Sequence, residues 1–94
     1  MEIKHEFDGD KGSYFIEEEG ERIAEMTYVM SSNTLVIFDH TEVSPLLKGQ
    51  GVGRKLVEAG VQMAREKGWK VVPLCPFAKA ESDKHREYHD ILAG

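Results

Sequence analysis

A glycine-rich loop between an apolar strand and an amphipathic helix constrains this chain more than any other feature. Residues 48–53 (KGQGVG) follow an expected strand, residues 34–43, and lead into an expected helix, residues 51–67. Glycine permits positive φ angles and lets a ligand approach the main chain closely. The first N–H groups of a helix lack internal partners and lie at the positive end of its dipole, which suits a phosphate. We therefore predict a ligand carrying a diphosphate, with an ordinary turn as the alternative, because such glycine spacings are weak motifs by themselves.

Two common phosphate-binding loops do not fit this sequence. A Walker loop ends in Gly-Lys-Ser or Gly-Lys-Thr, whereas Gly53 is followed by Arg54, Lys55 and Leu56. A dinucleotide-binding fingerprint requires Gly-x-Gly-x-x-Gly, and here the third glycine comes one residue too soon. The loop thus belongs to another class of phosphate site, or to none.

Residues 48–53 resemble the acetyl-coenzyme A loop of the GCN5-related N-acetyltransferases, which reads Arg/Gln-x-x-Gly-x-Gly/Ala after a central strand. Lys48 takes the first position, which keeps a positive charge but loses the planar fork of arginine. Residues 40–43 (HTEV) and 73–78 (PLCPFA) look like the small single-domain branch that includes the N-acetyltransferase domain-containing 1 group. The resemblance covers roughly residues 35–92 and implies transfer of acetyl from acetyl-CoA to an amine.

Length and composition indicate a single soluble domain. The 94 residues are 40% hydrophobic and 31% charged, as in small globular proteins, so we expect one minimal domain, 1–94. No stretch approaches the roughly 18 apolar residues that span a bilayer, and we expect no membrane association. One cysteine forms no internal disulfide, which favours a cytoplasmic location. The net charge of −5 argues against nucleic-acid binding.

Hydrophobic periodicity predicts an α/β (α+β) fold with a mixed sheet of about five strands and helices on its faces. Residues 2–8, 13–19 and 22–30 alternate and are separated by turn residues, which predicts an antiparallel meander. The apolar run 35–38 does not alternate, which predicts a strand covered on both faces. The helix 51–67 then leads into a strand, 69–75, which we expect to be parallel to its predecessor.

Two further expectations concern the connections and the core. Residues 77–93 should form one or two short helices, the second over 85–92, and Ala24, Met26, Tyr28 and Met30 should face the core. Residues 8–12 leave room only for a turn, where the resembled fold has helices between its first two strands.

The resemblance also implies where acetyl-CoA binds. In that family the fourth and fifth strands splay apart, and the pantetheine arm lies between them. Backbone groups of the fourth strand contact the arm, and the glycine loop surrounds the diphosphate. The implied cofactor-binding residues are Thr41, Val43, Lys48, Gly49, Gln50, Gly51, Val52, Gly53 and Arg54.

Four side chains are candidates for the chemistry. His40 and Glu42 share a face of their strand, so either can serve as general base; the alternative is a structural hydrogen bond or a solvated strand end. Cys75 ends the fifth strand beside the expected thioester, where it can accept the acetyl group or remain an inert core cysteine. Tyr88 corresponds to a tyrosine that protonates the leaving thiolate in the family, with core packing as its alternative. We expect His40, Glu42 and Cys75 to converge on one place.

Two interpretations compete at this point. One is an acetyl-CoA-dependent N-acetyltransferase that uses direct transfer to an amine, with an acetyl-Cys75 route second. The other is an inactive CoA-binding or protein-interaction module. The acceptor (a protein, a peptide or a polyamine) and the oligomeric state are left open by the residues. No metal site is expected, because His85 and His89 have no clear third ligand.

Overall fold

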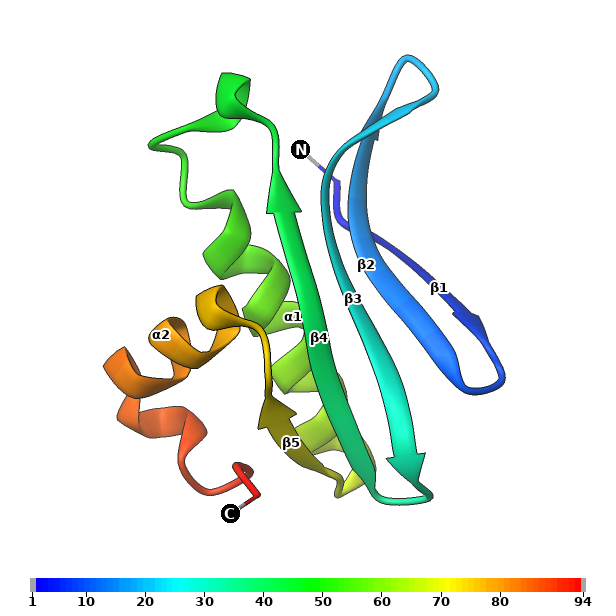
Figure 1. Ribbon diagram of the computed structural model, residues 1–94, viewed down its shortest axis with the longest axis vertical. Coiled ribbons are helices and arrows are strands. Elements are labelled where there is room, and N and C mark those ends of the chain that lie inside the picture. Colours follow the sequence, from blue (N-terminus) through cyan, green and yellow to red (C-terminus); the bar gives the residue numbers. More distant parts are fainter. Residues whose placement is uncertain (1, 94) are drawn as a thin grey trace.

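The computed structural model describes residues 2–93, whose strands form one five-stranded mixed sheet (Figure 1). The strands are β1 (Lys4–Asp8), β2 (Lys11–Glu18), β3 (Glu21–Ser32), β4 (Leu35–Val43) and β5 (Lys70–Pro73). Their order in the sheet follows the chain, with antiparallel pairing from β1 to β4 and parallel pairing of β4 with β5. This confirms the predicted meander followed by a parallel crossover.

Tight turns join the first three strands. Asp8 pairs with Lys11 across the β1–β2 turn, so no helix separates these strands, as expected. The β2–β3 turn places Glu19 at φ 51° and Gly20 at φ 82°. Both values lie in the left-handed region that matches the twist of a two-residue hairpin.

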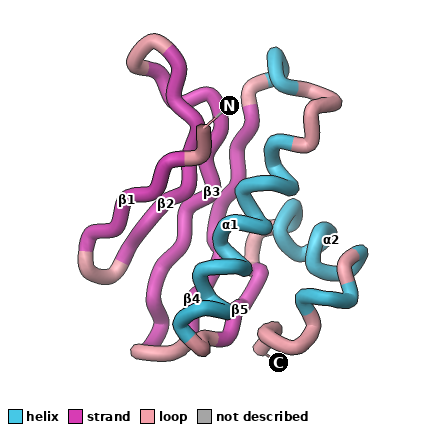
Figure 2. The backbone as a smooth tube through the Cα atoms, turned by 180° about the vertical axis from the view of Figure 1, so that it is seen from behind, coloured by secondary structure: helices cyan, strands magenta, loops and turns pink. Residues whose placement is uncertain are grey.

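Helix α1 (Val52–Lys67) covers one face of the sheet, which we call the covered face (Figure 2). It ends at Gly68, which takes the left-handed conformation expected after a helix. Met26 and Phe38 are fully buried beneath it, as is Leu56 on the helix itself. A Cβ added at Gly60 would lie 2.7 Å from both Met26 Cε and Phe38 Cζ, so this glycine lets the helix approach the sheet closely.

Shorter helical segments precede α1 and follow β5. A 3-10 turn, η1 (Pro45–Leu47), precedes the glycine loop; helix α2 (Pro76–Lys84) and a second 3-10 turn, η2 (Arg86–Tyr88), follow β5. Residues 91–93 are not helical, contrary to the expected helix 85–92. Val71 N–H donates to Ile91 O at 2.8 Å, and Ala93 N–H donates to Val71 O at 2.9 Å. The outer edge of β5 has backbone groups that need hydrogen-bond partners, and residues 91–93 supply them by lying extended beside Val71 instead of continuing a helix.

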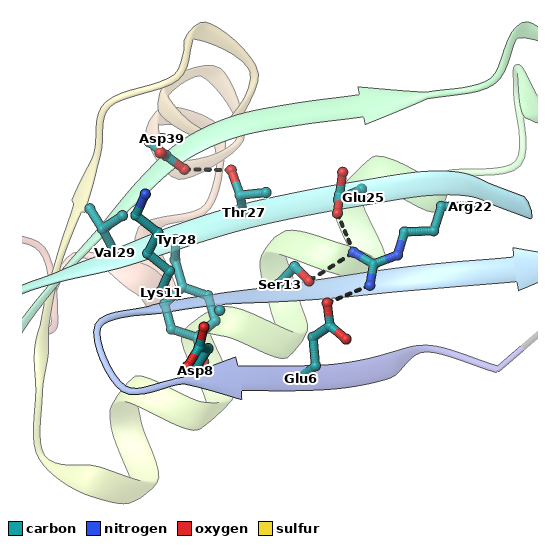
Figure 3. A pocket seen from close by; sticks show the side chains of 11 residues that line it. Glu6, Asp8, Lys11, Ser13, Arg22, Glu25, Thr27, Tyr28, Val29 and Asp39 are labelled. Atoms are coloured by element: carbon teal, nitrogen blue, oxygen red, sulfur yellow. Dashed lines mark hydrogen bonds and ion pairs between the residues drawn. The ribbon is translucent and has the colours of Figure 1, made fainter.

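The opposite face, which we call the open face, corrects another expectation. The predicted burial of the fourth strand on both faces is wrong: Val36 and Phe38 are fully buried, whereas Leu35 and Ile37 are half-buried. Among residues 2–93, neither helix lies across this face, which bears a polar hollow of ≈ 460 Å³ (Figure 3). None of the helices in this range is long and apolar enough to cross a membrane.

Candidate active site and cofactor cradle

The glycines of the loop have different structural tasks. Gly49 at φ 83° and Gly51 at φ 69° adopt left-handed conformations, and a Cβ added at either would meet nothing within 4 Å. Gly53 lies inside α1, where a Cβ would stand 2.5 Å from Cζ of Phe77. The first two glycines therefore shape the backbone, whereas the third makes room for a neighbouring ring.

A hollow of ≈ 320 Å³ lies beside this loop. The first turn of α1 contains no acidic residue, and Lys48 and Arg54 add positive charge at the positive end of the helix dipole. All of the predicted cofactor-binding residues except Thr41 and Gln50 line the hollow: Val43, Lys48, Gly49, Gly51, Val52, Gly53 and Arg54. The positive charge beside the N-terminus of α1 suits a diphosphate.

Two residues of α2 complete the hollow and were not predicted. Phe77 and Glu81 lie four positions apart, one turn of the helix, and both line the hollow. The Glu81 carboxylate lies 3.2 Å from Nε2 of His85, so its charge has a partner when that imidazole is protonated. The helical spacing of this pair was the only sequence signal available, and it does not say which face of α2 meets the loop.

The fourth and fifth strands part at the level of Phe38. Their pairing ends with Phe38 opposite Pro73, and the N–H groups of Leu74 and Cys75 both donate to Phe38 O, at 3.0 and 3.1 Å. Beyond this point β4 continues to Val43, while the segment that follows β5 turns away into α2 (Figure 1). We call this point of separation the gap; Thr41 on β4 and Cys75 at the start of α2 contact each other there.

Cys75 lies at this gap and is buried, at 5% exposure. It is the N-cap of α2, where its Sγ accepts from Ala78 N–H at 3.4 Å. The same sulfur lies 3.2 Å from Oγ1 of Thr41 on β4. The thiol thus has a capping role and also joins α2 to the strand along which the pantetheine arm is expected.

A β-bulge in β4 decides which side chains share this location. Tyr28 pairs with Phe38 and Thr27 with His40, so Asp39 is an extra residue in β4. An extra residue reverses the alternation of all side chains that follow it. Thr41 consequently faces the covered side, opposite buried Met26.

His40 and Glu42 face the open side instead, opposite Thr27 and Glu25. They share one face as predicted, with Nε2 of His40 at 3.4 Å from Oε2 of Glu42. The expected convergence of this pair with Cys75 does not occur, because the bulge places them on the other side of the sheet. An unbroken alternation from Phe38 would have put both on the covered side.

Tyr88 does not line the hollow beside the glycine loop. It is buried in η2 and lines a hollow with the α1 residues Lys55, Glu58 and Gln62. Burial, followed by the nearby carboxylate of Glu58, raises the pKa of its phenol. The burial agrees with core packing, its alternative role, and the charges of Arg54 and Glu81, which line the hollow beside the glycine loop, also act on its pKa.

Polar side chains organise the open face (Figure 3). The Arg22 guanidinium donates to Glu6 on β1, to Ser13 on β2 and to Glu25 on β3, and lies 3.8 Å from the centre of the Phe15 ring. Thr27 Oγ1 donates to the Asp39 carboxylate at 2.5 Å, which holds the bulged residue toward this face. Within residues 2–93, no three acidic, histidine or cysteine side chains are grouped as a metal site.

Comparison with known proteins decides the family. A model described as GCN5-related N-acetyl-transferase matches residues 13–91. The chain belongs to the GCN5-related N-acetyltransferase family. This membership identifies it as an acetyltransferase, whose general reaction is acetyl-CoA-dependent acetyl transfer.

Solved structures of this family agree with the fold. The solution structure of a GCN5-like protein from Staphylococcus aureus is 40% identical, covers 99% of this chain and 88% of that chain, and has a TM-score of 0.74. A GNAT family acetyltransferase from Elizabethkingia anophelis with acetyl-CoA bound is 17% identical, covers 66% of this chain and 41% of that chain, and has a TM-score of 0.56. At that identity the second comparison shows the fold alone. Among curated proteins, none matches the chain significantly.

Proposed function

We propose that this chain is an N-acetyltransferase that moves the acetyl group of acetyl-CoA to an amine, with residues 1–94 acting as one minimal domain in the cytoplasm. The observation that carries the proposal is the continuity of three features. The hollow beside the glycine loop adjoins β4 at Val43, β4 runs back to the gap at Phe38, and Cys75 lies at that gap. A diphosphate, an extended arm and a thioester follow each other in the same order in acetyl-CoA.

The residues of the cradle fit acetyl-CoA in charge and shape. Lys48, Arg54 and the N-terminus of α1 would hold the diphosphate, and Gln50 lies in the same loop. The backbone of Thr41 and Val43 would accompany the pantetheine arm, since β4 has left its parallel partner at this point. When bound, acetyl-CoA supplies the activated thioester.

For direct transfer, the amine would approach from the open face. His40 lies there with Glu42 at 3.4 Å, and the carboxylate would orient the imidazole as general base. The amine nitrogen would attack the thioester carbonyl and lose its proton to His40, and the carbon–sulfur bond would break to release the CoA thiolate. The base on the open face and the thioester on the covered face would both act on the amine where β4 and β5 part, and holding the reactants together there would supply much of the rate.

An acetyl-Cys75 route is the second candidate, because Sγ lies at the gap within 3.2 Å of Thr41 Oγ1. The thiolate would attack the thioester first, and the amine would then attack acetyl-Cys75. Cys75→Ser and Cys75→Ala distinguish the routes, since serine keeps a capping oxygen for Ala78 N–H. If Cys75→Ser retains turnover, the covalent route is excluded; loss in a folded Cys75→Ser variant supports it.

Turnover with defined amines tests the proposal. Acetyl-CoA consumption is measured with n-pentylamine, spermidine and a lysine-containing peptide, which also compares polyamine and peptide acceptors. We expect at least one to be acetylated and Gly51→Glu to abolish the reaction, because it sets a carboxylate against the diphosphate. Binding of acetyl-CoA without transfer to any amine would favour the alternative, an inactive CoA-binding or protein-interaction module.

A further inference from the structure

Phe77 occupies an unusual position for a large apolar side chain. The residue is 39% exposed, and it lines the hollow beside the glycine loop together with the cationic residues Lys48 and Arg54. A partly exposed phenylalanine on a protein surface needs no explanation by itself. This ring, however, lies within the proposed cofactor hollow and is fitted closely to a glycine.

The fit concerns the third glycine of the loop. A Cβ at Gly53 would lie 2.5 Å from Cζ and 2.8 Å from Cε1 of Phe77, so alanine would displace the ring. Gly53 also lies inside α1, where helix propensity alone would favour alanine. Unlike Gly49 and Gly51, it has no positive φ to explain it. The ring of Phe77 is therefore the structural reason for glycine at this position.

The first turn of α2 connects the two ends of the cofactor cradle. Phe77 lies on Gly53 at the start of α1, and Cys75, two residues earlier, contacts Thr41 on β4. The first turn of α2 therefore contacts both the start of α1 and β4, and the Phe77 ring lines the hollow that Val43 and the glycine loop share.

We propose that Phe77 is a positioning residue whose ring forms the apolar wall for the pantetheine arm, and that Gly53 seats this ring rather than admitting a phosphate. The inference rests on the proposed function, because it takes acetyl-CoA as the ligand. The arm buries part of the exposed ring, so removing the ring weakens binding of the arm and leaves binding of the diphosphate intact.

Two probes separate these contributions. CoA contains the pantetheine arm, and 3′-phosphoadenosine 5′-diphosphate is the same nucleotide without it. Dissociation constants are measured by NMR titration for wild type, Phe77→Ala, Gly53→Ala and the double variant. Phe7→Ala is the matched control, because Phe7 is 51% exposed and lines a different hollow.

We expect Phe77→Ala to weaken CoA about tenfold, as loss of a partly buried aromatic contact predicts, and to leave the nucleotide probe unchanged. Gly53→Ala should weaken CoA in the wild-type background and have no further effect in the Phe77→Ala background. Phe7→Ala should change neither constant. Lys48→Ala should weaken both probes, since it removes a charge from the diphosphate end.

Two results would overturn the inference while the cofactor assignment stands. One is equal weakening of both probes, or of neither, by Phe77→Ala. The other is weakening of the nucleotide by Gly53→Ala in both backgrounds, which would mean that the phosphate needs the glycine. If Gly53→Ala does not fold, Phe77→Leu replaces it and should retain part of the CoA affinity. Failure of wild type to bind either probe would instead refute the proposed function.

Discussion

The two faces of the sheet differ in the side chains they carry and in how deeply these are buried, although the same strands form both. On the covered face, Met26 and Phe38 are fully buried beneath α1 within the hydrophobic core. On the open face, Glu25, Thr27 and Asp39 form a polar surface with hydrogen bonds and ion pairs (Figure 3). The difference indicates that the covered face supplies the stability of the fold, which leaves the open face free to carry chemistry.

At Asp39 a bulge shifts the alternation of side chains along β4 by one residue. Before it, alternation buries Phe38; after it, Thr41 turns to the covered side and His40 and Glu42 to the open side. One inserted residue thus places a thiol contact and a candidate base on opposite sides of a single strand. Bulges are often found beside active sites because they re-aim side chains in this way.

The largest effect should come from removing a core ring. Phe38→Ala is expected to lower the free energy of unfolding by about 3–5 kcal/mol, because it deletes a fully buried side chain under α1. Thr27→Ala, on the opposite face of the neighbouring strand, should cost only about 1 kcal/mol, the value of one hydrogen bond. Urea unfolding of both variants measures the difference. Equal losses would contradict the division of labour between the faces.

The next effect concerns turnover rather than stability. His40→Gln should lower kcat about 100-fold, as loss of a general base does, with Glu42→Gln lowering it less. Both side chains are well exposed, at 60% and 78%, so neither change should unfold the chain. Thermal unfolding of each variant provides the control. Full turnover by both variants would mean that neither residue is the general base and that the open face takes no part in the reaction.

A smaller loss of stability should follow from Arg22→Met, which keeps an unbranched apolar stem over Phe15 but removes the charge. Hydrogen bonding to Glu6 is the main cause that raises the pKa of Arg22. Because the guanidinium is partly exposed, we expect a cost of about 1 kcal/mol, reduced at high salt. Chemical unfolding at low and high salt tests this. A loss independent of salt would mean that packing on Phe15, rather than charge, holds the open face together.

The smallest effect is a pH dependence from the covered side of β1. Burial, and secondarily Lys67, lowers the pKa of His5 below 6.5, and its Nε2 lies 2.6 Å from the Tyr28 hydroxyl. The folded state therefore resists protonation, so stability should be unaffected above pH 6.5 and fall as the pH drops below it. His5→Phe should reduce the difference in urea midpoint between pH 8 and pH 5.5. An unchanged difference would show that other groups cause the acid sensitivity.

The sequence predicted regular elements better than it predicted their relation to each other. Gly68 marked the end of α1, and alternation identified Ala24, Met26 and Tyr28 as core residues, because both signals are local. The bulge left no local signal, since Asp39 follows Phe38 as it would in a regular strand. The apolar run 35–38 likewise gave no sign that only one face is covered.

The candidate site shows the same limit. The glycine loop was predicted from its own residues, and most of its members line one hollow. Phe77 and Glu81 enter that hollow from another helix, and only the docking of α2 on α1 brings them there. The predicted meeting of His40, Glu42 and Cys75 failed because it depended on side-chain direction after the bulge.

A titration of isotope-labelled protein with acetyl-CoA, followed by amide NMR shifts, tests the central claim most directly. We expect saturable shifts at Val43, Gly51, Gly53 and Phe77, with Ser13 and Lys11 on the open face unchanged. Shifts concentrated on the open face around Ser13 would contradict the assignment of the cofactor to the glycine loop and the gap beyond it. In that case the cofactor would occupy the face from which the amine is proposed to approach His40 and Glu42.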